Sequence, residues 1–154
     1  MGNRFLDALL GRKTDRTPVV LRRFGVADDV RSRDVLAVEE DHWLVDAPGN
    51  QLIRLFEVSS PDAERCILTY RAVMQSEELA GRAYLEMWCR FPGRGEFFSR
   101  GLNQPLQGSV WWTPFETPFR LRKGERPDLI KLNLVVEGAG KIRIKDVELL
   151  KTPA

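Results

Sequence analysis

Apolar and polar residues alternate along the last third of the chain. In residues 129–137 one phase is apolar and the other mostly polar: Ile130, Leu132, Leu134 and Val136 against Lys131, Asn133 and Glu137. Because successive side chains of a strand point to opposite faces, this spacing predicts a strand with one buried and one solvated face. A glycine-rich turn at 138–140 leads into a second alternating segment, 142–150, which predicts an antiparallel hairpin.

The same alternation recurs upstream, between clusters of Gly, Pro, Asn, Asp and Ser. It predicts strands over 41–45, 51–58, 65–75 and 82–91, with a short connection at 77–81. Only residues 4–10 have a helical period. Short strands separated by turns are typical of an all-β sandwich or barrel, here of about eight strands.

The length of 154 residues predicts one folded domain. We assign residues 1–18 to an N-terminal arm and linker and residues 19–154 to the β-sandwich domain. Segment 4–10 gathers Phe5, Leu6, Leu9 and Leu10 on one side. It is interpreted either as a loosely docked arm or as a surface anchor for a membrane or a partner.

The net charge of +2 is spread evenly, with basic residues interleaved among acidic ones, so no nucleic acid partner is expected. No apolar run approaches the roughly 18 residues of a membrane span. The N-terminus lacks the small-residue cleavage site of a signal peptide, which predicts a cytoplasmic protein. Cys66 and Cys89 are accordingly expected to be reduced thiols in the core.

The end of the chain carries a recognisable series of motifs. They are Trp112-Thr113, Pro118-Phe119, the alternating strand, Gly138-x-Gly140 and Ile144-Lys145-Asp146-Val147-x-Leu149. This series resembles the last three strands of carbohydrate-binding-module jelly rolls, also called galactose-binding-like domains. The resemblance implies an antiparallel jelly-roll β-sandwich and, as one class of ligand, a carbohydrate.

The resemblance also raises the question of a structural calcium ion. In many such modules an Asp of the closing strand helps to hold calcium, and Asp146 matches that position. Lys145 stands where a second Asp is usual, and calcium prefers six to eight oxygen ligands. Asp146 is therefore either a weak calcium ligand or a strand-ending residue that bonds the backbone. No other cofactor is expected.

Catalytic chemistry has little support in the sequence. His42 is the only histidine, so no site that needs two histidines can form. Glu86 and Glu96 are candidates for a glycosidase pair, which needs carboxyl groups roughly 5–9.5 Å apart, but no spacing brings them together. No nucleophile elbow, metal-ligand spacing or cofactor motif is present. We therefore expect a domain that is not an enzyme.

The best candidate for a binding site is aromatic. On the strand at 82–91 the non-core phase carries Tyr84, Glu86, Trp88 and Arg90. A sugar ring packs its apolar face on an aromatic ring, while carboxylate and guanidinium groups bond its hydroxyls. The alternative is that loops or the arm cover Tyr84 and Trp88. Of the adjacent pair Trp111 and Trp112, one is expected in the core and the other at a surface.

These observations predict a non-catalytic binding domain, carbohydrate-binding in type. The alternative is a protein-interaction module, accessory or oligomerising, that docks another polypeptide through the same face or through the arm.

Overall fold

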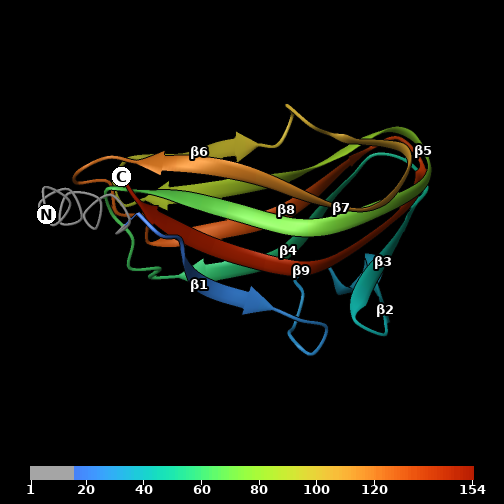
Figure 1. The fold of residues 1–154 in the computed structure, drawn as a ribbon, viewed down its shortest axis with the longest axis horizontal. Helices are drawn as coiled ribbons and strands as arrows, with labels where there is room; N and C mark the ends of the chain where they lie inside the picture. Colours follow the sequence, from blue (N-terminus) through green and yellow to red (C-terminus); the bar gives the residue numbers. More distant parts are fainter. Residues whose placement is uncertain (1–15) are drawn as a thin grey trace, which may run out of the picture.

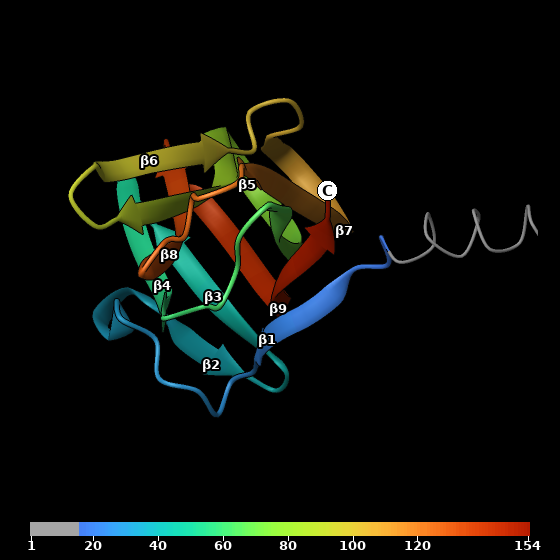
Figure 2. The ribbon, with the colours of Figure 1, turned by 90° about the vertical axis from the view of Figure 1, so that its left-hand side faces the viewer.

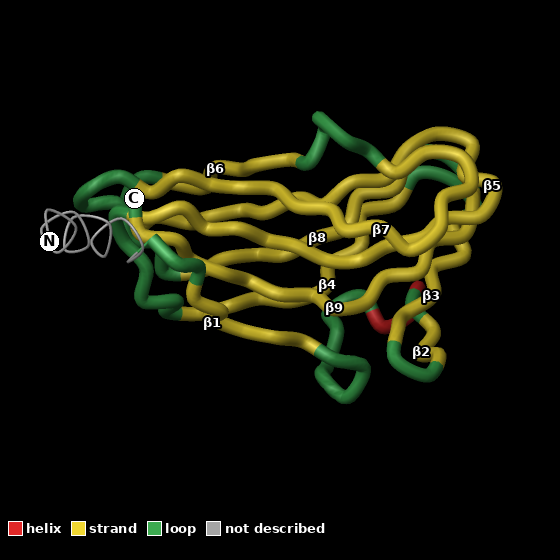
Figure 3. Tube along the Cα trace, in the orientation of Figure 1, coloured by secondary structure: helices red, strands yellow, loops and turns green. Residues whose placement is uncertain are grey.

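The computed structural model describes residues 16–154, and the predictions made for segment 4–10 of the N-terminal arm lie outside these residues. The described chain is β-structure with one short 3-10 helix, η1 (Arg33–Val35) (Figure 3). The strands are β1 (Val19–Phe24), β2 (Ala37–Glu39), β3 (His42–Ala47), β4 (Gln51–Ser59), β5 (Cys66–Phe91), β6 (Gly95–Arg100), β7 (Leu106–Leu121), β8 (Leu129–Glu137) and β9 (Gly140–Pro153). Every pairing is antiparallel, so the predicted all-β antiparallel class is confirmed, with one strand more than expected.

The strands form two layers around a shared core (Figures 1 and 2). In the β8 layer, β8 lies between β4 and the second half of β5, and β6 pairs with the far edge of that half. In the β9 layer, β9 lies between the first half of β5 and the strands β1 and β3, and β7 pairs with the far edge of β5. Strand β5 therefore belongs to both layers.

The continuity of β5 differs from the sequence prediction of two strands joined at 77–81. The pairing of β5 with β7 shifts register three times between Met74 and Arg82, and Glu78 takes a left-handed φ of 49°. Such bulges bend a strand without ending it. The chain thus passes from one layer to the other inside a single strand, and residues 77–81 mark the bend.

The core contains the apolar phases that the alternation predicted. On β8 all four apolar-phase residues are at most 1% exposed: Ile130, Leu132, Leu134 and Val136. The core-facing phase of the second half of β5 is buried as well and ends at Cys89 and Phe91. Cys66 and Cys89 are free thiols inside this core, and burial raises the pKa of Cys89 to about 12.

The prediction that one of the adjacent tryptophans joins the core is wrong. Trp111 is 76% exposed. Trp112 is half-buried on the outside, with the Lys145 Nζ atom 4.3 Å from its ring centroid and the His42 ring 5.2 Å away. The register shift between Met74 and Ser76 lies opposite this pair and takes β7 out of regular alternation. Within residues 16–154 no helix is long and apolar enough to span a membrane.

We expect Gly81→Ala to destabilise the domain by about 2 kcal/mol, because overpacking at a rigid contact is costly. A Cβ atom at Gly81 would collide with the carbonyl oxygen of Glu137 and lie 2.9 Å from its carbonyl carbon. Gly49→Ala is the matched control, since a Cβ atom there meets nothing within 4 Å. Urea denaturation of both variants tests this expectation, and equal stability of the two would contradict it.

Candidate functional site

The four residues predicted for ligand binding lie on the outer face of the β8 layer, as their phase requires. Glu86 stands between Asn133 on β8 and Arg100 on β6, and Trp88 stands between Lys131 and Phe98. A groove of about 410 Å³ lies over this face. We call it the Trp88 groove; its lining includes Arg54, Tyr84, Glu86, Trp88, Glu96, Arg100, Lys131 and Asn133.

Glu86 is the centre of a buried hydrogen-bond network below the groove. Its side chain is 4% exposed. Its Oε1 atom accepts hydrogen bonds from Trp88 Nε1 at 2.8 Å and Asn133 Nδ2 at 3.1 Å, and its Oε2 atom accepts one from Arg100 Nε at 2.8 Å. A buried carboxylate is tolerated only when it is paired in this way. Glu86 thus fixes the position of the Trp88 ring and has no oxygen left without a partner.

Tyr84 is covered by its neighbours and is only 5% exposed. The Arg82 guanidinium lies 5.5 Å from its ring centroid, and its hydroxyl donates a hydrogen bond to Glu137 Oε2 at 3.0 Å. Burial, and then the bond to Glu137, raises the pKa of Tyr84. The expected alternative for Tyr84 was cover by a loop or the arm, whereas in the described residues side chains of the same sheet contribute this cover.

Arg90 stands apart from the other three predicted residues. Its Nε and Nη2 atoms donate hydrogen bonds to the two oxygens of Asp128, at 2.9 and 3.2 Å. This pairing raises the pKa of Arg90 and lowers that of Asp128. Arg90 is on the predicted face but is not among the residues that line the groove. The structure therefore brings Tyr84, Glu86 and Trp88 together and leaves Arg90 at the end of the face.

The aromatic surface near the groove includes a residue that the sequence analysis missed. Trp88 is half-buried, and the Phe98 ring on β6 lies 5.0 Å from it at a tilt of 50°. Phe98 is 49% exposed, and the Arg100 guanidinium lies 4.0 Å from its ring centroid. Alternation within β6 shows that Phe97 and Phe98 point to opposite faces. Nothing in the sequence shows that β6 pairs with β5 so that Phe98 lies beside Trp88.

The polar rim of the groove comes from three further strands. Lys131 on β8 forms a 2.8 Å ion pair with Glu96 on β6. Arg54 on β4 makes no side-chain ion pair or hydrogen bond with any residue of 16–154. Glu86 and Glu96, the sequence candidates for a catalytic pair, are thus each bound to a different cation.

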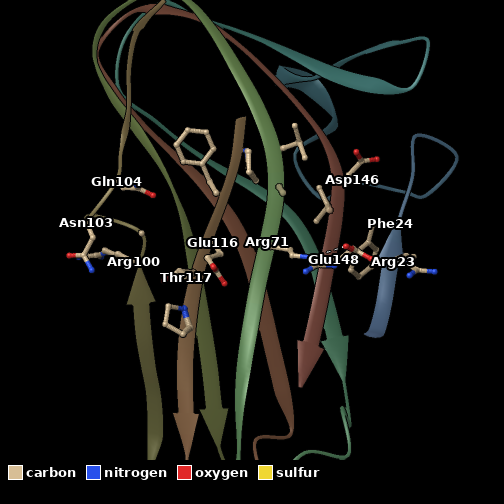
Figure 4. A pocket seen from close by; sticks show the side chains of 17 residues that line it. Arg23, Phe24, Arg71, Arg100, Asn103, Gln104, Glu116, Thr117, Asp146 and Glu148 are labelled. Carbon is tan, nitrogen blue, oxygen red and sulfur yellow. Dashed lines mark hydrogen bonds and ion pairs between the residues drawn. The ribbon is translucent and has the colours of Figure 1, made fainter. Parts of the chain in front are cut away.

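A larger groove, of about 1060 Å³, lies on the outer face of the β9 layer (Figure 4). We call it the Arg71 groove. Across its floor the register places Glu116 of β7, Arg71 of β5 and Glu148 of β9 side by side. Strand β1 bounds it on one side through Arg23, and the segment after β6 bounds it on the other.

The floor of the Arg71 groove is ordered by one shared carboxylate. Glu148 accepts hydrogen bonds from Arg71 Nε at 2.9 Å and from Arg23 Nε at 2.7 Å. Burial alone would raise the pKa of Glu148, but these two guanidinium groups outweigh burial and lower it. The carboxylate is therefore ionised at neutral pH and holds both arginines.

Asp146, the candidate calcium ligand, also lines the Arg71 groove. Asp146 is exposed and has a left-handed φ of 52°. It lies at the point where the pairing of β9 with β5 shifts register. Within residues 16–154 no three His, Cys, Asp or Glu side chains are grouped so that they could hold a metal ion. Calcium binding at Asp146 stays a prediction with no further ligand assigned to it.

His42 is held between two carboxylates and not beside a nucleophile. Its Nε2 atom lies 3.0 Å from Glu39 Oε1 and its Nδ1 atom 3.0 Å from Asp41 Oδ1. Arg143 and then His42 lower the pKa of Glu39, and His42 lowers that of Asp41. Glu39 on β2 also accepts a 3.2 Å hydrogen bond from Arg143 on β9. The cluster thus links β2, β3 and β9, which indicates a structural role for His42.

Comparison with known proteins identifies the fold. No protein-family model and no curated protein matches the chain. Among solved structures, the CBM22-1–GH10 modules of Clostridium thermocellum endo-1,4-β-D-xylanase 10B, complexed with xylohexaose, match at a TM-score of 0.53 and 8% identity; the match covers 89% of this chain and 26% of that one. A CBM4 structure matches at 0.51 and 9% identity, over 84% of this chain and 78% of the other.

A family 30 carbohydrate-binding module matches at a TM-score of 0.51 and 11% identity, over 86% of this chain and 93% of the module. The chain thus spans about a quarter of the first match but most of the other two. Identities this low show the fold alone. The fold is that of the carbohydrate-binding-module β-sandwiches, and the resemblance predicted from the closing strands is confirmed.

We expect Glu86→Ala to destabilise the domain by about 3 kcal/mol, because removal of one partner leaves Arg100, Asn133 and the Trp88 Nε1–H without acceptors. Glu96→Ala is the matched control and should cost under about 1 kcal/mol, because its pair with Lys131 is one-third exposed. Urea denaturation measures both values. A Glu86→Ala variant as stable as Glu96→Ala would show that the network contributes no stability.

Proposed function

We propose that this domain is a non-catalytic carbohydrate-binding domain and that its ligand lies in the Trp88 groove. The observation that carries the proposal is the Trp88 ring itself, which is partly open to solvent and held by a 2.8 Å hydrogen bond to a buried carboxylate. The fold shared with carbohydrate-binding modules supports the ligand class.

The aromatic part of the site suits the apolar face of a sugar. A ring whose rotamer is already fixed loses little conformational entropy when a ligand packs on it. Trp88 meets this condition through Glu86, and Phe98 beside it widens the aromatic surface. An aromatic contact contributes about 1 kcal/mol beyond the burial of area, so binding to a single sugar ring is weak.

The polar part of the site suits sugar hydroxyls. The Lys131–Glu96 pair lies on the rim and offers a donor and an acceptor. The Arg54 guanidinium, which has no partner among the described residues, offers further donors. The groove volume of about 410 Å³ is in the usual range of roughly 300–1,000 Å³ for ligand sites. Tyr84 and Glu86 support the site from below, and Arg90 closes the predicted face at its end.

The same geometry favours binding without catalysis. Glu86 is saturated by its three hydrogen bonds, and Glu96 is paired with Lys131. Glycoside hydrolysis needs one carboxyl group that donates a proton and a second that acts on the sugar or on water. Glu57, the third carboxylate of the groove lining, forms an ion pair with Arg31 at 3.1 Å. None of the three carboxylates therefore stands free for the first task.

Trp88→Ala should weaken glycan binding at least tenfold while the domain stays folded, because the core-facing side chains of β5 are unchanged. A glycan array gives the first ligand, and calorimetric titration with that ligand measures the loss. Trp111→Ala is the control, since Trp111 is 76% exposed and contributes nothing to either groove.

Two results would contradict the proposal. If Trp88→Ala unfolds the domain, Trp88 is a structural residue and not the platform of a site. If the wild type turns over a glycoside and Glu96→Gln abolishes the turnover, the domain is an enzyme.

A second function, association with another polypeptide, is favoured by the strand β6. Phe97 and Phe98 are 47% and 49% exposed, and Leu102, just beyond the strand, is 39% exposed. Within residues 16–154 strand β6 pairs only with β5. Exposed aromatics on such an edge strand are typical of sites where a further strand is added. We take a second copy of this chain as the partner to be tested.

If β6 mediates association, static light scattering should show a dimer at micromolar concentration, and Phe97→Lys should convert it to a monomer. Val38→Lys is the control, because Val38 is also exposed but lies on β2. A wild type that is monomeric throughout, or a dimer that Phe97→Lys leaves intact, would exclude association through β6.

A further inference from the structure

The Arg71 groove is distinct from the site proposed above, although one residue, Arg100, lines both grooves. Its floor is the outer face of β7, β5 and β9, so it lies on the other layer from the Trp88 groove (Figure 4). Its volume of about 1060 Å³ is just above the roughly 300–1,000 Å³ usual for ligand sites. It is therefore large enough for an elongated ligand.

The centre of the groove is a guanidinium group held in place in advance. Arg71 donates through Nε to Glu148 at 2.9 Å, and the side chain is 49% exposed. Arg23 holds the same carboxylate at 2.7 Å from the other side. Within residues 16–154, the terminal nitrogens of Arg71 make no hydrogen bond, so they are free to donate to a ligand.

Two carboxylates with no partner among the described residues flank this guanidinium. Glu116 is the cross-strand neighbour of Arg71 on β7, and Asp146 lies on β9 (Figure 4). Neither side chain forms an ion pair or a hydrogen bond within residues 16–154, and both residues are exposed. The bulge at Asp146, with its left-handed φ of 52°, re-aims this side chain away from regular alternation, and such features cluster at functional sites.

Amide and apolar groups complete the lining. Asn103 and Gln104, on the segment between β6 and β7, stand at one wall and are exposed (Figure 4). In the next row of the floor the register places Val73 opposite Pro114. A row of hydrogen-bonding groups thus runs beside an apolar row, the arrangement that an amphipathic sugar ring requires.

The charges of the groove select the ligand. The carboxylates of Glu116 and Asp146, which have no partner among the described residues, repel an anionic ligand, and the guanidinium of Arg71 repels a cationic one. A hydroxyl group, by contrast, can donate a hydrogen bond to either carboxylate and accept one from the guanidinium. We infer that the Arg71 groove is a second binding site, separate from the Trp88 groove, for a neutral hydroxyl-rich ligand, and that an uncharged oligosaccharide is the class that fits.

The experiment is a titration of the isotope-labelled full chain with cellohexaose and with xylohexaose, followed by amide chemical shifts. Shifts at Arg71, Glu116 and Asp146 are expected, and they should persist in Trp88→Ala, which removes the other site. The double variant Glu116→Ala/Asp146→Ala should weaken this binding at least tenfold. Asp34→Ala, an exposed carboxylate outside the groove, is the matched control.

Each outcome decides the inference. Groove shifts that survive Trp88→Ala and are lost in the double variant support it, whether or not the Trp88 groove binds. Absence of groove shifts at millimolar ligand overturns it, as does binding that the folded double variant retains. Tighter binding of an oligogalacturonate or of a chitosan oligomer, which carry negative and positive charge respectively, overturns the neutral ligand class.

Discussion

The whole architecture depends on the bend of β5. Hydrogen bonding along one strand edge joins β5 to β9 in its first half and to β8 in its second, so the two layers share a single backbone. At the bend, β5 passes close to the β8–β9 turn. Gly81 allows this close approach because the Glu137 carbonyl occupies the space that a Cβ atom at position 81 would need. Both grooves lie on halves of this strand, so the bend also sets how they are placed.

The acidic side chains on the two outer faces are stabilised in different ways. On the β8 layer, Glu86 is removed from water and takes three hydrogen bonds, which stiffens the face around one aromatic ring. On the β9 layer, Glu148 is shared by two arginines, but the side chains of Glu116 and Asp146 have no partner within residues 16–154. A fully partnered network can position groups for a ligand, whereas side chains without a partner can contact a ligand directly. The two sites that we propose therefore differ in kind.

The fold does not decide the function by itself, because one sandwich can carry unrelated sites. The structural matches show the carbohydrate-binding-module fold at identities of 8–11%. The ligand class that we propose depends instead on side chains: the half-buried Trp88 ring, the Arg54 guanidinium without a partner in residues 16–154, and the row through Arg71. Phe97 and Phe98 are exposed on β6, and this edge is therefore also a candidate for association with a polypeptide.

The sequence alone determined the β class, the buried phase of strands such as β8, and the shared face of Tyr84, Glu86 and Trp88, because alternation is a local property of the chain. The continuity of β5 and the exposure of both Trp111 and Trp112 followed from register shifts, which no local pattern shows. Only the tertiary structure revealed that Arg82 covers Tyr84 and that Phe98 flanks Trp88. The Arg71 groove was likewise invisible, since its residues come from β1, β5, β7 and β9 and meet only through strand pairing.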